Sequence, residues 1–311
     1  MSDLMELEEP QEEHSHEMRD EIRAISDRVR ARRIARSRVM IVLCGLALAV
    51  AAVPLVLLII QLIGKGAPTL SWKFFTTLPT TPSLIDPNGT GGVSNAVVGT
   101  IALTIYASIM AIPLGVFSGV YLAESSSKLA STLRVIAQTM AGAPSILMGL
   151  FAFSFIVTDL HVGFSALAGA FALGVLMLPV IAISTEIAVR NVPMTLREAG
   201  LALGAKPHKV STRVVLPAAA TGIVTGCILA ISRAVGETAP VLLTIAGGYL
   251  NSWQLLHPVS ALPLSIYENA KSEWPSQRAQ VWGIALVLVA FVFVLSLGAR
   301  IWASRKQQVR N

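Results

Sequence analysis

The chain has 311 residues, of which 54% are hydrophobic and only 14% charged, and its mean hydropathy is +0.67. Because soluble domains carry about 25% charged residues, this composition excludes a soluble globular protein and indicates an integral membrane protein. The net charge of +6 does not require a nucleic-acid partner, since the basic residues are placed as a membrane topology requires.

Residues 1–39 are expected to form a cytoplasmic tail with two parts. Residues 1–21 are acidic and include an isolated His-Ser-His sequence at 14–16. We interpret them as a disordered, solvated tail rather than a metal site. Residues 19–38 are basic, which predicts an amphipathic helix along the surface of the lipid membrane, with a nucleic-acid-binding arm as the alternative. The tail lacks the apolar core of a cleavable signal peptide.

Six apolar runs follow, and each is long enough to cross the hydrocarbon core, which takes a helix of about 20 residues. None alternates in short segments as transmembrane β-strands do. The fold class predicted is therefore all-α, a polytopic membrane bundle of six transmembrane helices. The runs are 40–63, 93–122, 133–157, 164–188, 218–246 and 281–303.

The six runs divide the rest of the chain. The first transmembrane helix, at 40–63, is followed by an external loop at 64–92, and a core of five transmembrane helices extends over 93–303. Of the 24 Lys and Arg residues, nineteen fall on the side of the N-terminal tail and four on the other side. Basic residues favour the cytoplasmic side, so both termini, including 304–311, are predicted to be cytoplasmic.

Residues 247–280 form the second long external connection. It carries Trp253, Trp274 and three prolines. Such a segment suits a surface that receives a partner, and its aromatic residues suit ordinary anchoring at the membrane interface equally well.

The connection between the fourth and fifth runs, at 190–217, contains the sequence EAGLALGAKPHKVSTRVVLP. Gly204 is expected to end one short helix, and Pro207 to begin a second at its first position. The first helix has an apolar side that something should cover. It is either a hairpin packed against its own bundle or a docking element for another protein.

This segment resembles the EAA loop of ABC-transporter permeases: Glu-Ala-Ala, three residues, Gly, nine residues, then Ile-x-Leu-Pro. The matching positions are Glu198, Ala199, Gly204, Leu216 and Pro217, with Gly200 and Val214 as departures. The resemblance implies a type I (MetI-like) importer permease whose loop couples it to a separate ATPase subunit. The chain contains no G-x-x-x-x-G-K-[ST] phosphate loop. We therefore expect no cofactor on this chain and no ATPase site; ATP and Mg²⁺ would be used by the partner ATPase.

The sequence ISRAVGETAP at 231–240 places Arg233 and Glu237 within the fifth apolar run. Continuous helix through that run would put Arg233 about 20 Å from either end, near the middle of the membrane. An arginine there is tolerated where it faces the protein interior or a wet cavity. Two interpretations stay open, a buried structural ion pair and an anion-binding site in which the guanidinium binds phosphate oxygens.

Helical spacing puts this pair on the same face as Gly222 and Gly226, whose spacing lets helices approach closely. Glu237 lies four residues after Arg233, within reach of it. It could hold Arg233 in place when the site is empty, or accept a hydrogen bond from a protonated oxyanion.

Over about residues 90–303 the chain resembles the phosphate-specific ABC permeases of PstA type. The similarity rests on SRAVGETAP at 232–240, GGVSNAVVGT at 91–100 and AGAPSILMGLF at 141–151. Thr238 and Ser145 lie in these motifs and join the predicted substrate pathway. The family has a basic residue shortly before Thr-Glu in the fourth span, where this chain has Ile183, so a second cation would come from a partner chain.

The resemblance implies a phosphate importer in the plasma membrane of a bacterium or archaeon. Its partners would be a homologous second permease (PstC-like), two copies of an ATPase and an external phosphate-binding protein. Two other functions stay open: a permease of the same fold for another oxyanion, such as sulfate or molybdate, and a non-transporting subunit that signals phosphate status. An enzymatic function is not indicated, because the spans hold no defensible nucleophile–base pair.

Overall fold

The computed structural model describes residues 9–83, 86 and 89–308. Within these ranges the regular structure is helical, and only two isolated β-bridges occur, Pro79–Gly91 and Ala246–Val259. The chain divides at Gln61 into two compact units. The prediction of an all-α fold is confirmed.

The N-terminal helix α1 (Glu9–Gly66) is continuous over 58 residues. The predicted tail, amphipathic helix and first span are thus one helix, which differs from the expected disorder over 9–21 and from a separate surface helix. No helix end separates the basic segment from the apolar one, because the sequence between them lacks a turn signal. Residues 1–8 lie outside the described residues.

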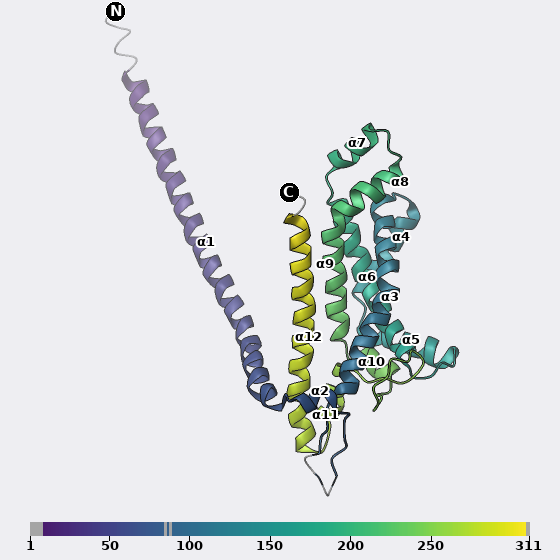
Figure 1. Cartoon of the computed structure of the whole chain (residues 1–311). Coiled ribbons are helices and arrows are strands. Elements are labelled where there is room, and N and C mark those ends of the chain that lie inside the picture. Colours follow the sequence, from purple (N-terminus) through teal and green to yellow (C-terminus); the bar gives the residue numbers. More distant parts are fainter. Residues whose placement is uncertain (1–8, 84–85, 87–88, 309–311) are drawn as a thin grey trace, which may run out of the picture. The chain divides into compact units, whose positions relative to one another are not determined.

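The second unit is built around four long helices, which run side by side in Figure 1. Their sequences are apolar enough to cross a membrane over most of their length. The four helices are α3 (Ser94–Glu124), α6 (Ala166–Arg190), α9 (Leu216–Val235) and α12 (Pro275–Gln308).

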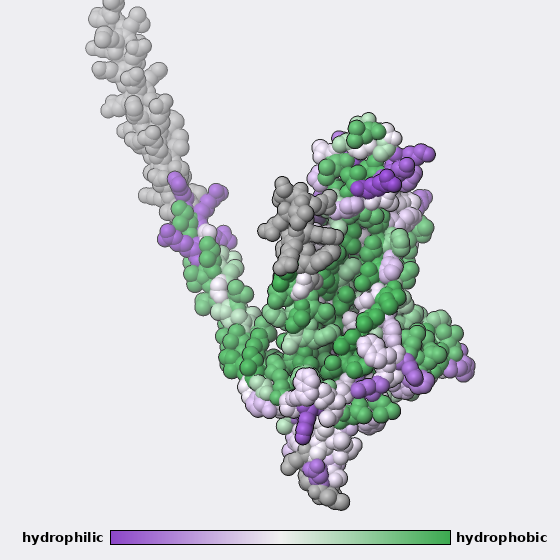
Figure 2. All heavy atoms as spheres, viewed as in Figure 1, coloured by the Kyte–Doolittle hydropathy of each residue, from purple (hydrophilic) through white to green (hydrophobic). Residues whose placement is uncertain are grey.

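Shorter elements gather at the two ends of this bundle (Figure 1). One end, here called the α7 end, carries residues 191–215, with α7 (Met194–Ala202), α8 (Pro207–Val210) and the π-helix η3 (Ser211–Val215). The opposite α11 end carries η1 (Ala67–Thr69), α2 (Trp72–Thr76) and α11 (Leu262–Ala270). Figure 2 shows apolar side chains over the helix faces between the two ends, with polar residues concentrated at the ends.

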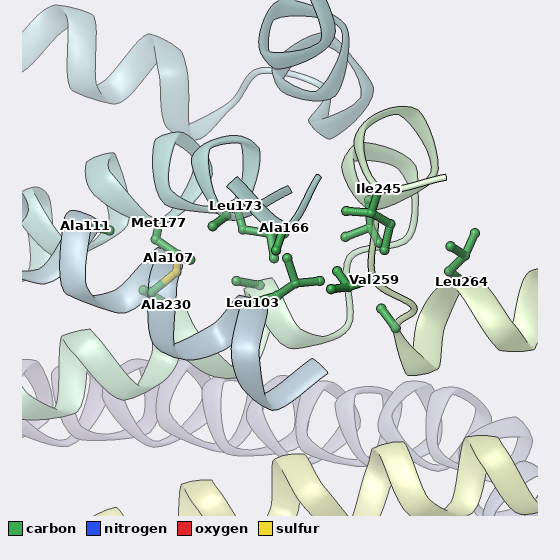
Figure 3. Close-up of a cluster of buried hydrophobic side chains, with 14 of the residues drawn as sticks. Leu103, Ala107, Ala111, Ala166, Leu173, Met177, Ala230, Ile245, Val259 and Leu264 are labelled. Atoms are coloured by element: carbon green, nitrogen blue, oxygen red, sulfur yellow. The ribbon is translucent and has the colours of Figure 1, made fainter. Parts of the chain in front are cut away.

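The core is made largely of small residues, which let the helices approach closely. The main cluster joins α3, α6 and α9; in Figure 3 the side chain of Met177 on α6 lies beside Ala107 on α3 and Ala230 on α9. All three are buried. This packing holds α9, and therefore the charged residues near its end, against α6.

Two of the six predicted spans are not single straight helices. The third run consists of α4 (Lys128–Ala141) and α5 (Ser145–Ala152) with the π-helix η2 (Phe153–Asp159), and the two parts are bent by 104°. The turn falls at residues 142–144, which end in Pro144, and the residue before a proline is disfavoured in helix. The structure therefore has five helices able to span a membrane within its described residues, and a sixth span if the bent pair counts as one.

The prediction that the fifth run, 218–246, forms one helix is wrong. It breaks after Val235, and a short helix α10 (Ala239–Thr244) follows. The ring of Pro240 would clash with the carbonyl of residue 236 if the helix continued, so the chain leaves the helical path here.

Candidate functional site: a charged helix break and an exposed α7

Arg233 and Glu237 flank the point where α9 ends. Arg233 lies in the last turn of α9, and Gly236 caps the helix by donating its amide to the Arg233 carbonyl at 3.1 Å. The Glu237 amide donates to the Ala234 carbonyl at 3.2 Å. This tight turn directs the Glu237 side chain back toward Arg233.

The two side chains form an ion pair, with 3.5 Å between Arg233 Nε and Glu237 Oε1. Arg233 is 46% exposed and Glu237 18% in this single chain. No second partner of the Arg233 guanidinium is found among the described residues. At 3.5 Å the contact is a loose one, so most of the planar donor fork stays open to a ligand.

The depth of Arg233 within the apolar part of the bundle can be estimated from the adjacent residue, Ser232. Ser232 Oγ lies 3.0 Å from Ser296 Oγ on α12. Ser296 lies about 20 Å along α12 from Val281 and about 10 Å from Ala303, the two ends of the last apolar run. The pair thus lies within the apolar thickness of the bundle, even though α9 stops beside it.

Gly222 and Gly226 lie at the contact between α9 and α6. A Cβ on Gly222 would lie 2.7 Å from Ala188 Cβ, and one on Gly226 would lie 2.4 Å from Ser184 Cβ. Real Cβ atoms do not approach this closely, so glycine sets the spacing of these helices. The predicted face does not extend to Glu237, because Glu237 lies beyond the end of α9.

Ser145 and Thr238 lie on neighbouring elements. Ser145 begins α5, and one turn later a Cβ on Gly149 would lie 2.6 Å from Pro240 Cα. Thr238 directly precedes α10. In the described part of the chain neither side chain hydrogen-bonds to the Arg233–Glu237 pair, so their place in the pathway stays a prediction.

A second ionic cluster, centred on the buried Glu186, was missed from the sequence. Glu186 Oε1 lies 2.7 Å from Arg134 Nε and 3.0 Å from Arg190 Nη2. Both arginines also donate to the Leu122 carbonyl, at 2.9 and 3.2 Å. The four-residue spacing of Glu186 and Arg190 was a usable signal, but nothing in the sequence pointed to Arg134 on α4.

The predicted two-helix connection at 190–217 is present. Gly204 has φ +76° and donates to the Leu201 carbonyl at 2.9 Å, the left-handed helix end that glycine allows. Pro207 is the first residue of α8. Leu216 and Pro217 begin α9.

Helix α7 is poorly covered by its own chain. It contains no buried residue, and Glu198 and Ala199 are exposed. Leu203, directly after the helix, is 89% exposed, and Met194, Leu196 and Leu201 are exposed as well. A hairpin packed onto its own bundle would bury this apolar side, so the docking interpretation is favoured.

One side chain ties α7 to the bundle. Arg197 Nη1 lies 2.6 Å from Glu124 Oε1 at the end of α3, and Arg197 Nη2 donates to the Val189 carbonyl of α6 at 3.1 Å. Arg197 thus links helix α7 to both central helices, while Val192, Val210 and Val215 of the α7 end pack against the bundle in a separate apolar cluster.

Known proteins match this arrangement. A family model described as "Binding-protein-dependent transport system inner membrane component" matches residues 111–308. The phosphate transport system permease protein PstA of Xylella fastidiosa (strain Temecula1) is 37% identical over 241 residues, covering 77% of this chain and 82% of that protein. The chain belongs to this family of ABC importer permeases.

Other relatives of this PstA-like permease extend the match. A probable phosphate transport system permease protein PstA from Methanocaldococcus jannaschii is 33% identical over 270 residues, covering 86% of this chain and 94% of that protein. The inward-facing MetNI methionine ABC transporter matches with a TM-score of 0.55 and 21% identity, over 69% of this chain and 94% of that one. The MetI-like fold predicted from the EAA-type loop is therefore confirmed. The protein is a multi-pass membrane permease subunit.

Proposed function

We propose that this chain is the membrane permease subunit of an ATP-driven importer of inorganic phosphate. Phosphate would pass Arg233, with Thr238 and Ser145 as further members of the pathway. The names of its relatives in two domains of life support phosphate as the substrate.

The observation that carries the proposal is the open guanidinium of Arg233 beside Glu237 at the end of α9. Arginine presents donors in a planar fork that matches the oxygens of an oxyanion. The loose 3.5 Å contact lets Glu237 neutralise Arg233 when no anion is bound and turn away when one arrives. A carboxylate at this point also disfavours a fully ionised anion and can accept a hydrogen bond from the P–OH group of a protonated phosphate, which a fully ionised sulfate does not offer.

We further propose the assembly and orientation. The exposed side of α7, with Glu198 and Ala199, would dock on an ATPase subunit, so the α7 end and both termini face the cytoplasm. The complex would contain a PstC-like second permease, two ATPase copies and an external phosphate-binding protein at the α11 end. ATP and Mg²⁺ would bind the ATPase, and this chain would hold no cofactor.

Arg233→Gln tests the proposal. It keeps the size of the side chain and removes the charge, so phosphate uptake by the assembled system should fall by about tenfold or more, while complex assembly and ATP hydrolysis persist. Lys128→Gln removes one exposed charge from the start of α4, away from the docking side of α7 and from the α11 end, and should leave uptake unchanged.

Normal uptake by Arg233→Gln would make the ion pair structural. Competition of labelled phosphate uptake by sulfate and by molybdate tests selectivity in the same preparation. Equal competition by these anions would replace phosphate with the broader oxyanion class.

A further inference from the structure

A polar cavity of about 400 Å³ opens at the α11 end, away from Arg233. It lies between the segment before α3, the turn at 246–249 and helices α11 and α12. Its lining is rich in hydroxyl and amide side chains, among them Thr80, Thr90, Asn95, Ser265, Asn269 and Gln280.

Glu268 is the one acidic or basic side chain among the described residues that line the cavity. Its basic neighbours are engaged elsewhere. Lys271 contacts the hydroxyl of Tyr267 and lies 3.8 Å from the centre of that ring, and Arg278 donates to the Ser272 and Glu273 carbonyls. Partial burial raises the pKa of Glu268. Among the described residues Glu268 forms no salt bridge with a lysine or arginine.

The walls of the cavity are preformed by hydrogen bonds between segments far apart in sequence. Asn95 Nδ2 donates to the Gly248 carbonyl at 2.6 Å, and Gln280 Nε2 donates to the Gly91 carbonyl at 3.0 Å. Asn269 Nδ2 reaches Gln280 Oε1 at 3.4 Å. A ligand that enters would thus find fixed polar groups and need not order the loops itself.

The turn at 246–249 brings backbone close to Glu268. Ala246 and Gly247 both have positive φ, +57° and +70°. A Cβ on Gly247 would lie 3.1 Å from Glu268 Oε1, so glycine allows the close approach. Tyr249 lines the cavity, and both Tyr249 and the next residue, Leu250, are strongly exposed.

We propose that this cavity receives a lysine or arginine side chain of the external phosphate-binding protein. The lone carboxylate attracts a cation and repels phosphate, so the cavity is not a second substrate site. Hydroxyl and amide groups can accept the remaining donors of an ammonium or guanidinium group. Exposed Tyr249 and Leu250 give the surrounding apolar contact that interfaces use around a buried charge.

A bound metal ion fits the site less well than a basic side chain. No cluster of three or more His, Cys, Asp or Glu side chains occurs among the described residues. A single carboxylate with neutral groups is a poor cage for a divalent cation, which selects several oxygen ligands including charged ones.

The inference rests on the proposed function, which places the α11 end outside and supplies the partner. The test measures binding of the system's own phosphate-binding protein to the whole transporter complex in lipid nanodiscs. Glu268→Gln should weaken binding about tenfold and reduce its dependence on salt. Glu273→Gln removes the same charge from an exposed position outside the cavity lining, and should bind like the wild type.

A second variant identifies the occupant. Glu268→Arg should abolish binding, and a Lys→Glu or Arg→Glu substitution at one position of the binding protein should restore it. Because Glu268 is a partly desolvated charge, Glu268→Gln should fold at least as stably as the wild type, which a thermal melt of the complex verifies.

Equal affinities for the wild type and Glu268→Gln, or an equal loss with Glu273→Gln, would overturn the inference. So would failure of every charge reversal on the binding protein to rescue Glu268→Arg. Phosphate uptake is measured in the same preparation: no uptake by the wild-type complex contradicts the proposed function, whereas normal uptake with equal affinities contradicts the cavity alone.

Discussion

Gly226 allows α9 to lie close to α6 because it has no side chain. Its α-carbon faces Ser184 so closely that an added Cβ would lie 2.4 Å from the Ser184 Cβ. The neighbouring backbone belongs to the long helix α6, which is packed on both α3 and α9 and cannot shift alone. A methyl group at residue 226 must therefore separate α9 from α6.

We expect Gly226→Ala to destabilise the protein by about 1–3 kcal/mol, the usual penalty for overpacking. The melting temperature of the purified permease in detergent measures this. Adding Ser184→Gly removes the opposing Cβ and should recover part of the loss. Gly298→Ala, where nothing lies within 4 Å of the added methyl group, should be neutral or slightly stabilising. Equal melting temperatures for both alanine variants would contradict the close approach.

The sequence could predict contacts between nearby residues of the sites, but not contacts that only the fold creates. Arg233 and Glu237 could be paired from the sequence because four-residue spacing is a local property. Glu186 could not be assigned its second partner, since Arg134 is 52 residues away and only the fold brings α4 to α6. The cavity around Glu268 was equally out of reach, because its walls come from segments separated by more than 150 residues.

At the scale of helices, the apolar runs predicted where helices occur better than where they break. Four long runs became α1, α3, α6 and α12, since apolar length alone specifies a membrane helix. The breaks after Ala141 and Val235 lie within longer apolar runs, at the short segments Gly-Ala-Pro (142–144) and Gly-Glu-Thr-Ala-Pro (236–240). Glycine and proline mark both breaks, but proline is also found within α3 and α6 at Pro113 and Pro179, where the helix continues.

Helix α7 meets the bundle through the ion pair of Arg197 with Glu124. The pair is partly exposed, so it contributes little to stability, about 0.2–1 kcal/mol. The pair matters because it links α7 to two other helices. A movement of α7 would be transmitted to α3 and α6 through the contacts of Arg197. The pair should therefore affect coupling more than folding.

Arg197→Glu is expected to lower the phosphate transported per ATP hydrolysed several-fold, because two carboxylates then repel each other at this contact. Uptake and ATP hydrolysis are measured together in proteoliposomes of the whole complex. The double variant Arg197→Glu with Glu124→Arg restores opposite charges and should recover part of the ratio. An unchanged ratio in the single variant would show that the link carries no coupling.

For the whole molecule, the two ends of the bundle differ in chemistry as well as in structure. The α7 end has the uncovered apolar side of α7, the two arginines paired with Glu186 and the arginine paired with Glu124. The α11 end has a polar cavity in which Glu268 is the one charged side chain among the described lining residues. Basic residues favour the cytoplasm, so this asymmetry predicts the α7 end inside and the α11 end outside.

Cysteine accessibility tests this sidedness. In a background with Cys44 and Cys227 replaced by serine, Ser126→Cys reports on the α3–α4 connection at the α7 end, and Glu273→Cys reports on the exposed segment after α11. A membrane-impermeant maleimide should label position 273 in right-side-out vesicles and position 126 only in inverted ones, because a charged reagent cannot cross the hydrocarbon core. Retained phosphate uptake shows that each variant is correctly inserted. Labelling with the opposite sidedness would show that the topology is the reverse of the predicted one. The docking side of α7 would then lie outside the cell, where an ATPase subunit bound to it would have no ATP to hydrolyse.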